Sequence, residues 1–213
     1  MDEKKKFDFV FSSGEELFFT SDTHFHHENI IKFCNRPFTD VQEMDNILVE
    51  RWNKVVSVDA TVFHLGDFAW GGYNAWKNVR ERLNGRIILV KGNHDDKNMT
   101  SMAANELFSL VTYQLKVKIE DRVVYLNHYP FLTYAGVYRR KEDMIWQLYG
   151  HVHTGPLSSN GKDLSRMQIA YPTQYDVGVD NNHFRPISWE EVKGKIEAKI
   201  NEAEENLENI EEE

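Results

Sequence analysis

Short apolar runs that end in glycine or polar residues recur along this sequence, and they restrict the folds that the chain can adopt. In the first half the runs are Glu16–Ser21, Ala60–Gly66 and Arg86–Gly92, each of a length that suits a buried strand. Amphipathic segments with near-helical spacing of apolar residues separate them, at Asp40–Val56 and Tyr73–Leu83. This alternation predicts right-handed βαβ units around a parallel sheet.

The second half predicts a different arrangement of strands. Apolar and polar residues alternate along Leu110–Glu120 and Arg122–Pro130, and the tight polar turn between them predicts a β-hairpin. Met144–His153 and Gln174–Asp180 are further strand candidates. We therefore expect an antiparallel or mixed set of strands beside the parallel set.

The C-terminal segment predicts a helix. Ser188 and Glu191 have the spacing of a capping box. The apolar residues that follow alternate steps of four and three, as in a coiled coil, and are Ile196, Ile200, Ala203, Leu207 and Ile210. We divide the chain into a domain over residues 1–187 and an acidic helix over residues 188–213. The seam spans only about two heptads, so the helix either packs on its own domain, which we favour, or mediates a homodimer.

Composition excludes several classes of protein. The net charge of −9, from 25 basic and 34 acidic residues, argues against binding duplex nucleic acid over a broad basic surface. Cys34 is the only cysteine, which excludes an intrachain disulfide and fits a cytoplasmic location. The N-terminus has no signal-peptide pattern, and apolar runs such as Arg86–Val90 are too short to cross a bilayer, so no membrane association is expected.

The polar ends of five apolar runs carry residue types that bind metals or transfer protons. They are Ser21–His24, Gly66–Phe68, Gly92–Asp96, Asn127–Pro130 and Gly150–His153. Ligands of α/β sheets bind outside the carboxyl ends of strands, so these groups would pool oxygen and imidazole donors at one edge. Such donors, without thiolate, favour Mn²⁺, Fe or Zn²⁺. Any one motif alone could be a charged surface loop, but all five in this order indicate a metal site.

The spacing of the motifs supports this interpretation. Residues i and i+2 of an extended chain point to the same side, so Asp22 and His24 could hold one ion together, and His151 and His153 could both face inward. A glycine such as Gly66 lets the backbone turn sharply and approach a ligand closely.

This order of motifs resembles the calcineurin-like metallophosphoesterase superfamily, from about Leu17 to about Asp180. The stretch His24–Phe38 is similar to a branch of small bacterial and phage members. The resemblance implies an α/β fold, a four-layer α/β/β/α sandwich of two mixed sheets, with a dinuclear metal centre at one edge of the facing sheets.

The resemblance also implies a role for each motif residue. One metal would be held by Asp22, His24 and His153. The other would be held by Asn93, His128 and His151. Asp67 would bridge both metals, and His94 would face the leaving group as general acid.

The expected activity is metal-dependent hydrolysis of phosphoesters, with a water bridging two divalent cations as the nucleophile. Mn²⁺ is the first candidate, and Fe, Zn²⁺ or Ni²⁺ are possible. The chain has no visible capping domain, so we favour a phosphodiester over a monoester, and a small phosphoester or nucleotide-like substrate. A non-catalytic metal-binding scaffold is one alternative, although no motif residue is missing. A nuclease is the other, and the acidic balance counts against it.

Three residues are candidates for substrate contacts. Asn93 could neutralise charge on the phosphate oxygens, and Arg36 could bind a phosphate oxygen in bidentate fashion unless it is a surface arginine. His27, like its neighbour His26, could touch substrate or belong to a solvated loop. Aromatic residues near the motifs, Trp70 among them, are core or lid residues or could stack on a base.

Overall fold

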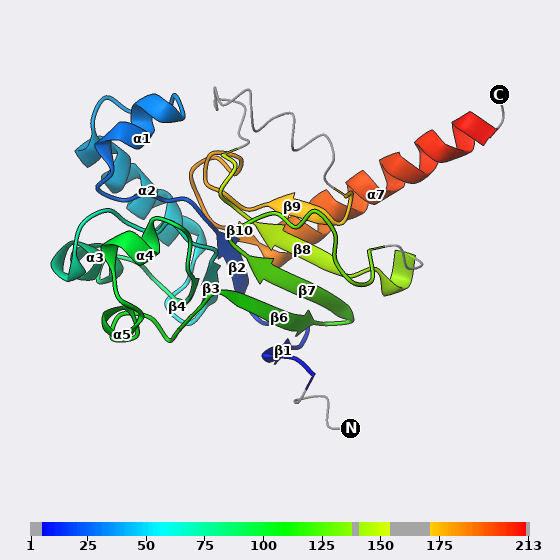
Figure 1. Ribbon diagram of the computed structural model, residues 1–213, viewed down its shortest axis with the longest axis horizontal. Helices are drawn as coiled ribbons and strands as arrows, with labels where there is room; N and C mark the ends of the chain where they lie inside the picture. Colours follow the sequence, from blue (N-terminus) through cyan, green and yellow to red (C-terminus); the bar gives the residue numbers. More distant parts are fainter. Residues whose placement is uncertain (1–5, 138–140, 154–170, 212–213) are drawn as a thin grey trace.

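The structure, a computed structural model, describes residues 6–137, 141–153 and 171–211. Two five-stranded sheets face each other (Figure 1). We call the sheet with the order β1-β6-β7-β8-β9 sheet A, and the sheet with the order β10-β2-β3-β4-β5 sheet B. The strands of sheet A are β1 (Phe9–Phe11), β6 (Gln114–Ile119), β7 (Arg122–Asn127), β8 (Trp146–Tyr149) and β9 (Gln174–Asp176). Those of sheet B are β2 (Leu17–Thr20), β3 (Thr61–His64), β4 (Arg86–Val90), β5 (Leu110–Thr112) and β10 (Ile187–Ser188).

Five helices lie on one side of the strands, and α7 extends away on the other (Figure 1). The five are α1 (Glu28–Phe33), α2 (Val41–Val55), α3 (Tyr73–Arg80), α4 (Asp95–Asn98) and α5 (Ser101–Ala104). A 3₁₀ turn, η2 (Lys141–Asp143), precedes β8, and α7 spans Trp189–Glu211. Among the described helices, none is long and apolar enough to cross a membrane.

Sheet B has the βαβ topology that the sequence predicts. Strands β2, β3 and β4 are parallel neighbours, and α2 and α3 connect them. The side chain of Asp40 caps α2 by accepting a hydrogen bond from the Glu43 amide. Trp52 of α2 and Trp76 of α3 are fully buried with the helix-facing side of sheet B. These contacts fix the strand ends that carry the motifs.

Sheet A combines antiparallel and parallel pairs. Strands β6 and β7 form the predicted hairpin, with Glu120 in its turn, while β7, β8 and β9 are parallel neighbours. Side chains from the inner faces of both sheets, such as Phe63 of β3 and Leu126 of β7, form a second hydrophobic core. The prediction of two mixed sheets with helices and a C-terminal helix is confirmed.

One predicted strand is wrong in its extent. Leu110–Glu120 is two strands, because the chain leaves sheet B after β5 and enters sheet A at β6, with only Tyr113 between them. Alternation of apolar residues cannot reveal this change of sheet, because both strands keep the same period of two. The sequence analysis also missed β1, β10 and α1, which are too short to give a periodic signal.

Helix α7 packs on its own domain through its first half. Ser188 and Glu191 form the predicted capping box, in which the Glu191 side chain accepts from the Ser188 amide at 3.0 Å and the Ser188 hydroxyl from the Glu191 amide at 3.3 Å. Val192, Ile196 and Ile200 are buried in the core between the sheets. The side chains of Leu207 and Ile210 lie outside the described part of the helix, so the homodimer stays a prediction, as does the domain boundary at residue 187.

Candidate metal centre

The polar segments that follow β2, β3, β7 and β8 are joined by backbone hydrogen bonds. The Asp22 amide donates to the Gly66 carbonyl at 2.9 Å, and the His24 amide donates to the Asp67 carbonyl at 3.0 Å. In the same way, the Gly150 amide donates to the His128 carbonyl at 3.0 Å. The strand ends therefore converge at one edge, as the topology predicts.

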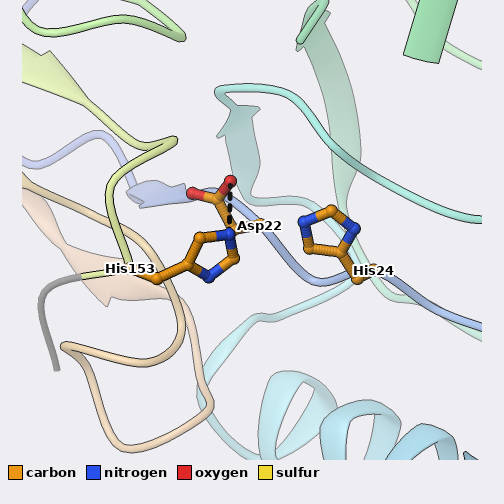
Figure 2. Close-up of side chains that lie close together, drawn as sticks. All are labelled: Asp22, His24 and His153. Carbon is orange, nitrogen blue, oxygen red and sulfur yellow. Dashed lines mark ion pairs between the residues drawn. The ribbon is translucent and has the colours of Figure 1, made fainter. Parts of the chain in front are cut away.

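Among the described residues, three groups of potential metal ligands form here. Two consist entirely of predicted ligands, and the third, Cys34, His153 and Asp180, shares His153 with the first of these two. In each group one donor atom per residue lies within 4.8 Å of the others. The first group is Asp22, His24 and His153, shown in Figure 2, and the second is Asp67, His128 and His151. The dashed contact in Figure 2 joins Asp22 Oδ1 to His153 Nε2 at 3.8 Å.

Asp67 belongs to the second group and also lies close to the first. Its Oδ2 atom is 3.5 Å from His24 Nε2 in the first group and 3.6 Å from His128 Nε2 in the second. The Asn93 side-chain oxygen is 3.1 Å from the same nitrogen of His128. The structure thus brings all seven predicted ligands to one edge, with the shared carboxylate in the centre.

Glycines allow this close packing. A Cβ atom at Gly92 would lie 2.3 Å from Asp67 Oδ1, and one at Gly150 would lie 2.0 Å from Ser21 Oγ and 2.3 Å from Asp22 Oδ2. Real Cβ atoms do not approach other atoms so closely, so any larger residue would displace the candidate ligands.

The backbone at the candidate ligands differs from the extended chain that the sequence analysis assumed. Five of them have left-handed φ angles: Asp22 (57°), His24 (49°), Asp67 (56°), His151 (74°) and His153 (49°). His151 and His153 belong to different groups, in the same division that the resemblance implies. Left-handed backbone costs of order 1–3 kcal/mol at a non-glycine residue, so such a concentration of it is typical of a functional site.

The chemistry of the site fits divalent cations. Asp22 Oδ1 and His24 Nε2 are buried and have no hydrogen-bond partner among the described residues. Burial raises the pKa of Asp22 to about 6 and that of Asp67 to about 8, because the carboxylates have lost water without gaining sufficient positive charge. Bound cations would supply that charge.

Hydrogen bonds fix the orientation of two histidines. His128 Nδ1 lies 2.7 Å from the Leu65 carbonyl, which can only accept, so this nitrogen carries the proton and Nε2 presents a lone pair to the site. His153 Nδ1 lies 2.7 Å from Asp180 Oδ2, which orients its Nε2 toward Asp22. Metal-binding histidines are usually oriented through their other nitrogen in this way.

Arg36 does not make the contact with substrate that the sequence predicted, because its guanidinium is buried against other groups of the protein. It is buried, and its guanidinium donates to both carboxylate oxygens of Asp180, at 2.9 and 2.8 Å. It also donates to the carbonyls of Asp22 and Thr23, at 2.7 and 3.0 Å. Arg36 lowers the pKa of Asp180 and holds the ligand segment and the partner of His153 in place. We therefore withdraw its assignment to substrate.

Asp95 is a second residue whose role the sequence did not reveal. Its buried carboxylate accepts hydrogen bonds from the amides of Asp67, Phe68 and Gly92, each at 2.8 Å. It thereby joins the segments after β3 and β4. The motif Gly92–Asp96 contained it, but nothing in the sequence distinguished a partner of the backbone from a ligand.

The other histidines of the motifs surround the two groups. His26 lies 2.6 Å from Asp45, on the side of α2, and is structural. The His94 ring lies 5.2 Å from that of His24, beside the candidate ligands, and its amide donates to Asp67 Oδ1 at 2.9 Å. His27 Nδ1 lies 3.4 Å from His24 Nδ1, and its ring stacks on Trp70.

Sequence comparison agrees with this fold. The profile of the calcineurin-like phosphoesterase superfamily domain matches residues 16–166, which is most of the chain. The chain belongs to this superfamily, and the resemblance inferred from the motifs is confirmed. The family supports metal-dependent phosphoester hydrolysis in general terms.

Several relatives are similar over most of their length. An uncharacterized protein of Methanocaldococcus jannaschii is 31% identical over 201 residues, covering 89% of this chain and 99% of that protein. The Gene 66 protein of Mycobacterium phage L5 is 27% identical over 188 residues, covering 76% of this chain and 85% of its own length. A crystal structure of a protein of unknown function from Aquifex aeolicus has a TM-score of 0.61 and 28% identity, covering 85% of this chain and 99% of that chain.

Proposed function

We propose that this protein is a phosphodiesterase that uses two divalent cations, with His94 as its general acid. The observation that carries the proposal is the position of Asp67 close to both ligand groups, with His94 beside them. Two-metal sites of this kind serve in-line displacement at phosphorus.

The proposal divides the candidate ligands between two cations. Asp22, His24 and His153 would hold one cation, and Asn93, His128 and His151 would hold the other. Asp67, which lies close to both sets, would contribute to both sites. The bound cations, Mn²⁺ first among Mn²⁺, Fe, Zn²⁺ and Ni²⁺, would neutralise the phosphate and lower the pKa of an attacking water.

In this proposal His94 protonates the leaving group. Its ring is half-buried beside His24, and its Nδ1 atom has no hydrogen-bond partner among the described residues. The backbone bond from its amide to Asp67 fixes it relative to the shared carboxylate. A donated proton stabilises the departing alkoxide, which water does poorly. Asn93 contacts the phosphate oxygens in this proposal.

The substrate is proposed to be a small phosphodiester of nucleotide-like type. The described residues contain no capping domain over the edge that carries the candidate ligands, which favours a diester over a monoester in this proposal. The net charge of −9 disfavours duplex nucleic acid. The single buried thiol, Cys34, supports the expectation of a cytoplasmic protein.

A substrate panel tests this proposal. We expect the Mn²⁺-loaded protein to hydrolyse bis-p-nitrophenyl phosphate faster than p-nitrophenyl phosphate, and EDTA to abolish both rates. Cyclic nucleotides and short single strands extend the panel to nucleotide-like substrates and nuclease activity. Stoichiometric metal binding without hydrolysis of any ester would contradict the proposal and favour a scaffold. A faster monoester would overturn only the preference for diesters.

A further inference from the structure

An exposed strip of aromatic side chains lies beside the candidate general acid. We define the aromatic strip as Phe33, His27 and Trp70. His27 and Trp70 stack with ring centroids 4.6 Å apart and an interplanar angle of 12°, and Phe33 meets His27 edge-on at 6.4 Å. Trp70 is 42% exposed and Phe33 is 65% exposed. Large aromatic side chains exposed side by side are typical of a binding surface.

The aromatic strip adjoins the reaction site directly. The Trp70 ring lies 5.8 Å from that of His94, and the His27 ring lies 5.3 Å from that of His24. We call the edge of the sheets that carries the candidate ligands the metal edge. A group attached to a phosphate held there, near His94, would therefore meet the ring of Trp70.

Hydrogen bonds fix the backbone at Trp70 relative to the backbone at His94. The Trp70 amide donates to the Phe25 carbonyl at 2.7 Å. The Asn98 side chain accepts from the Gly71 amide at 3.2 Å and donates to the His94 carbonyl at 2.7 Å. One side chain thus joins the two segments, so the platform is organised before a ligand binds.

From this geometry we propose that Trp70 is a stacking platform for a planar base, and that the substrates are phosphodiesters of nucleotides. This inference rests on the proposed function, since the metal edge is taken to hold the phosphate. Tryptophan stacks on every base through its π-face, so the platform selects the class of substrate rather than a particular base. His27 supports the ring of Trp70 from one side.

Fluorescence tests the platform without any hydrolysis. The other four tryptophans, Trp52, Trp76, Trp146 and Trp189, are at most 5% exposed, so Trp70 alone is accessible to a ligand. We expect adenosine 5′-monophosphate to quench the fluorescence of the Mn²⁺-loaded full-length protein saturably, and ribose 5-phosphate to have no such effect. Saturable quenching should disappear in Trp70→Leu. Equal quenching in Trp70→Leu, or none in the unaltered protein, would overturn the proposal.

Kinetics provides a second, independent measurement. The methyl diester of adenosine 5′-monophosphate is compared with the methyl diester of ribose 5-phosphate, and the ratio of their kcat/KM values is measured. We expect a ratio of about tenfold or more, from the stacking of one base, which Trp70→Phe largely retains and Trp70→Leu brings toward one.

A control variant is available, and a failure of the platform can be told apart from a failure of the proposed function. Tyr113 is 56% exposed and contacts Lys91 and Asp96 rather than the aromatic strip, so Tyr113→Leu should leave the ratio unchanged. Hydrolysis of both diesters at equal rates would refute the platform and leave the proposed function intact. Absence of all hydrolysis would refute the proposed function, and the quenching experiment would still decide the platform.

Discussion

The metal edge and the region around α7 differ in backbone conformation and in the kind of side chain that they bury. At the metal edge, five candidate ligands have left-handed backbone, and buried polar atoms lack hydrogen-bond partners among the described residues. Around α7, apolar side chains fill the core, a capping box starts the helix, and Lys193 pairs with Glu120 at 3.2 Å. The first region concentrates left-handed backbone and buried ligand-type atoms that a cation could contact, whereas the second is stabilised by apolar packing. Changes in the two regions should therefore affect different measurements.

Asp67→Asn should have the largest effect. It weakens the shared ligand of both groups, so we expect loss of bound metal and a fall in kcat/KM of ~10⁴-fold or more, because each cation supplies several kcal/mol to the transition state. The metal-free protein should become more stable, since the change removes a buried carboxylate with a raised pKa. Metal analysis and thermal unfolding in EDTA measure these effects. Asp121→Asn, on the exposed hairpin turn, is the control.

His94→Asn should separate catalysis from metal binding. Loss of a general acid lowers turnover by roughly 10²–10⁴-fold, while the metal content should stay unchanged. His183→Asn is the matched control, because His183 is an exposed histidine with a left-handed backbone that asparagine also tolerates. Unchanged turnover in His94→Asn would show that another group protonates the leaving oxygen.

Asp180→Asn should weaken metal binding more moderately. Asp180 contacts Nδ1 of His153 rather than the Nε2 atom that lies near Asp22, and the loss of such an orienting partner lowers metal affinity by about 10–100-fold. The buried Arg36 also loses its charged partner, so the free energy of unfolding should fall. Calorimetric titration with Mn²⁺ and urea unfolding test the two effects. Unaltered affinity would mean that backbone contacts alone position His153.

Ile196→Ala should leave the metal edge intact. It removes a fully buried side chain of α7, which lowers the free energy of unfolding by about 2–5 kcal/mol. Metal affinity and kcat/KM should stay within twofold of the unaltered protein at a temperature where both are folded. Ala198→Ser, a substitution in the same helix outside the hydrophobic core, serves as control. A large loss of metal affinity in Ile196→Ala would show that the two regions are coupled.

The sequence predicted the candidate ligands better than it predicted their surroundings. Asp22, Asp67 and His128 could be found because ligand types directly follow apolar runs, and strand ends of such a sheet meet at one edge. Arg36 and Asp180 lie 144 positions apart, so their ion pair leaves no local pattern. A bidentate arginine can bind a carboxylate or a phosphate equally well, and only the fold determined which.

The periodic patterns also failed to predict features that depend on segments distant in the sequence. Alternation identified the strands of the β6–β7 hairpin because each buries one face. It did not reveal where the chain changes sheets at Tyr113, because the period does not depend on the partner strand. Nor did it reveal the left-handed backbone at Asp22 or His24, which depends on contacts with the segments after other strands.

The exchange of strands between the sheets affects how the chain can be synthesised and folded. The early strand β1 completes sheet A beside β6, whereas the late strand β10 completes sheet B beside β2. Sheet A is not finished until β9 has been synthesised, and sheet B is not finished until residues 187–188 of β10 have been synthesised. Pairings between such distant segments form slowly. A nascent chain that already contains every candidate ligand would thus still lack the finished scaffold needed to gather a cation.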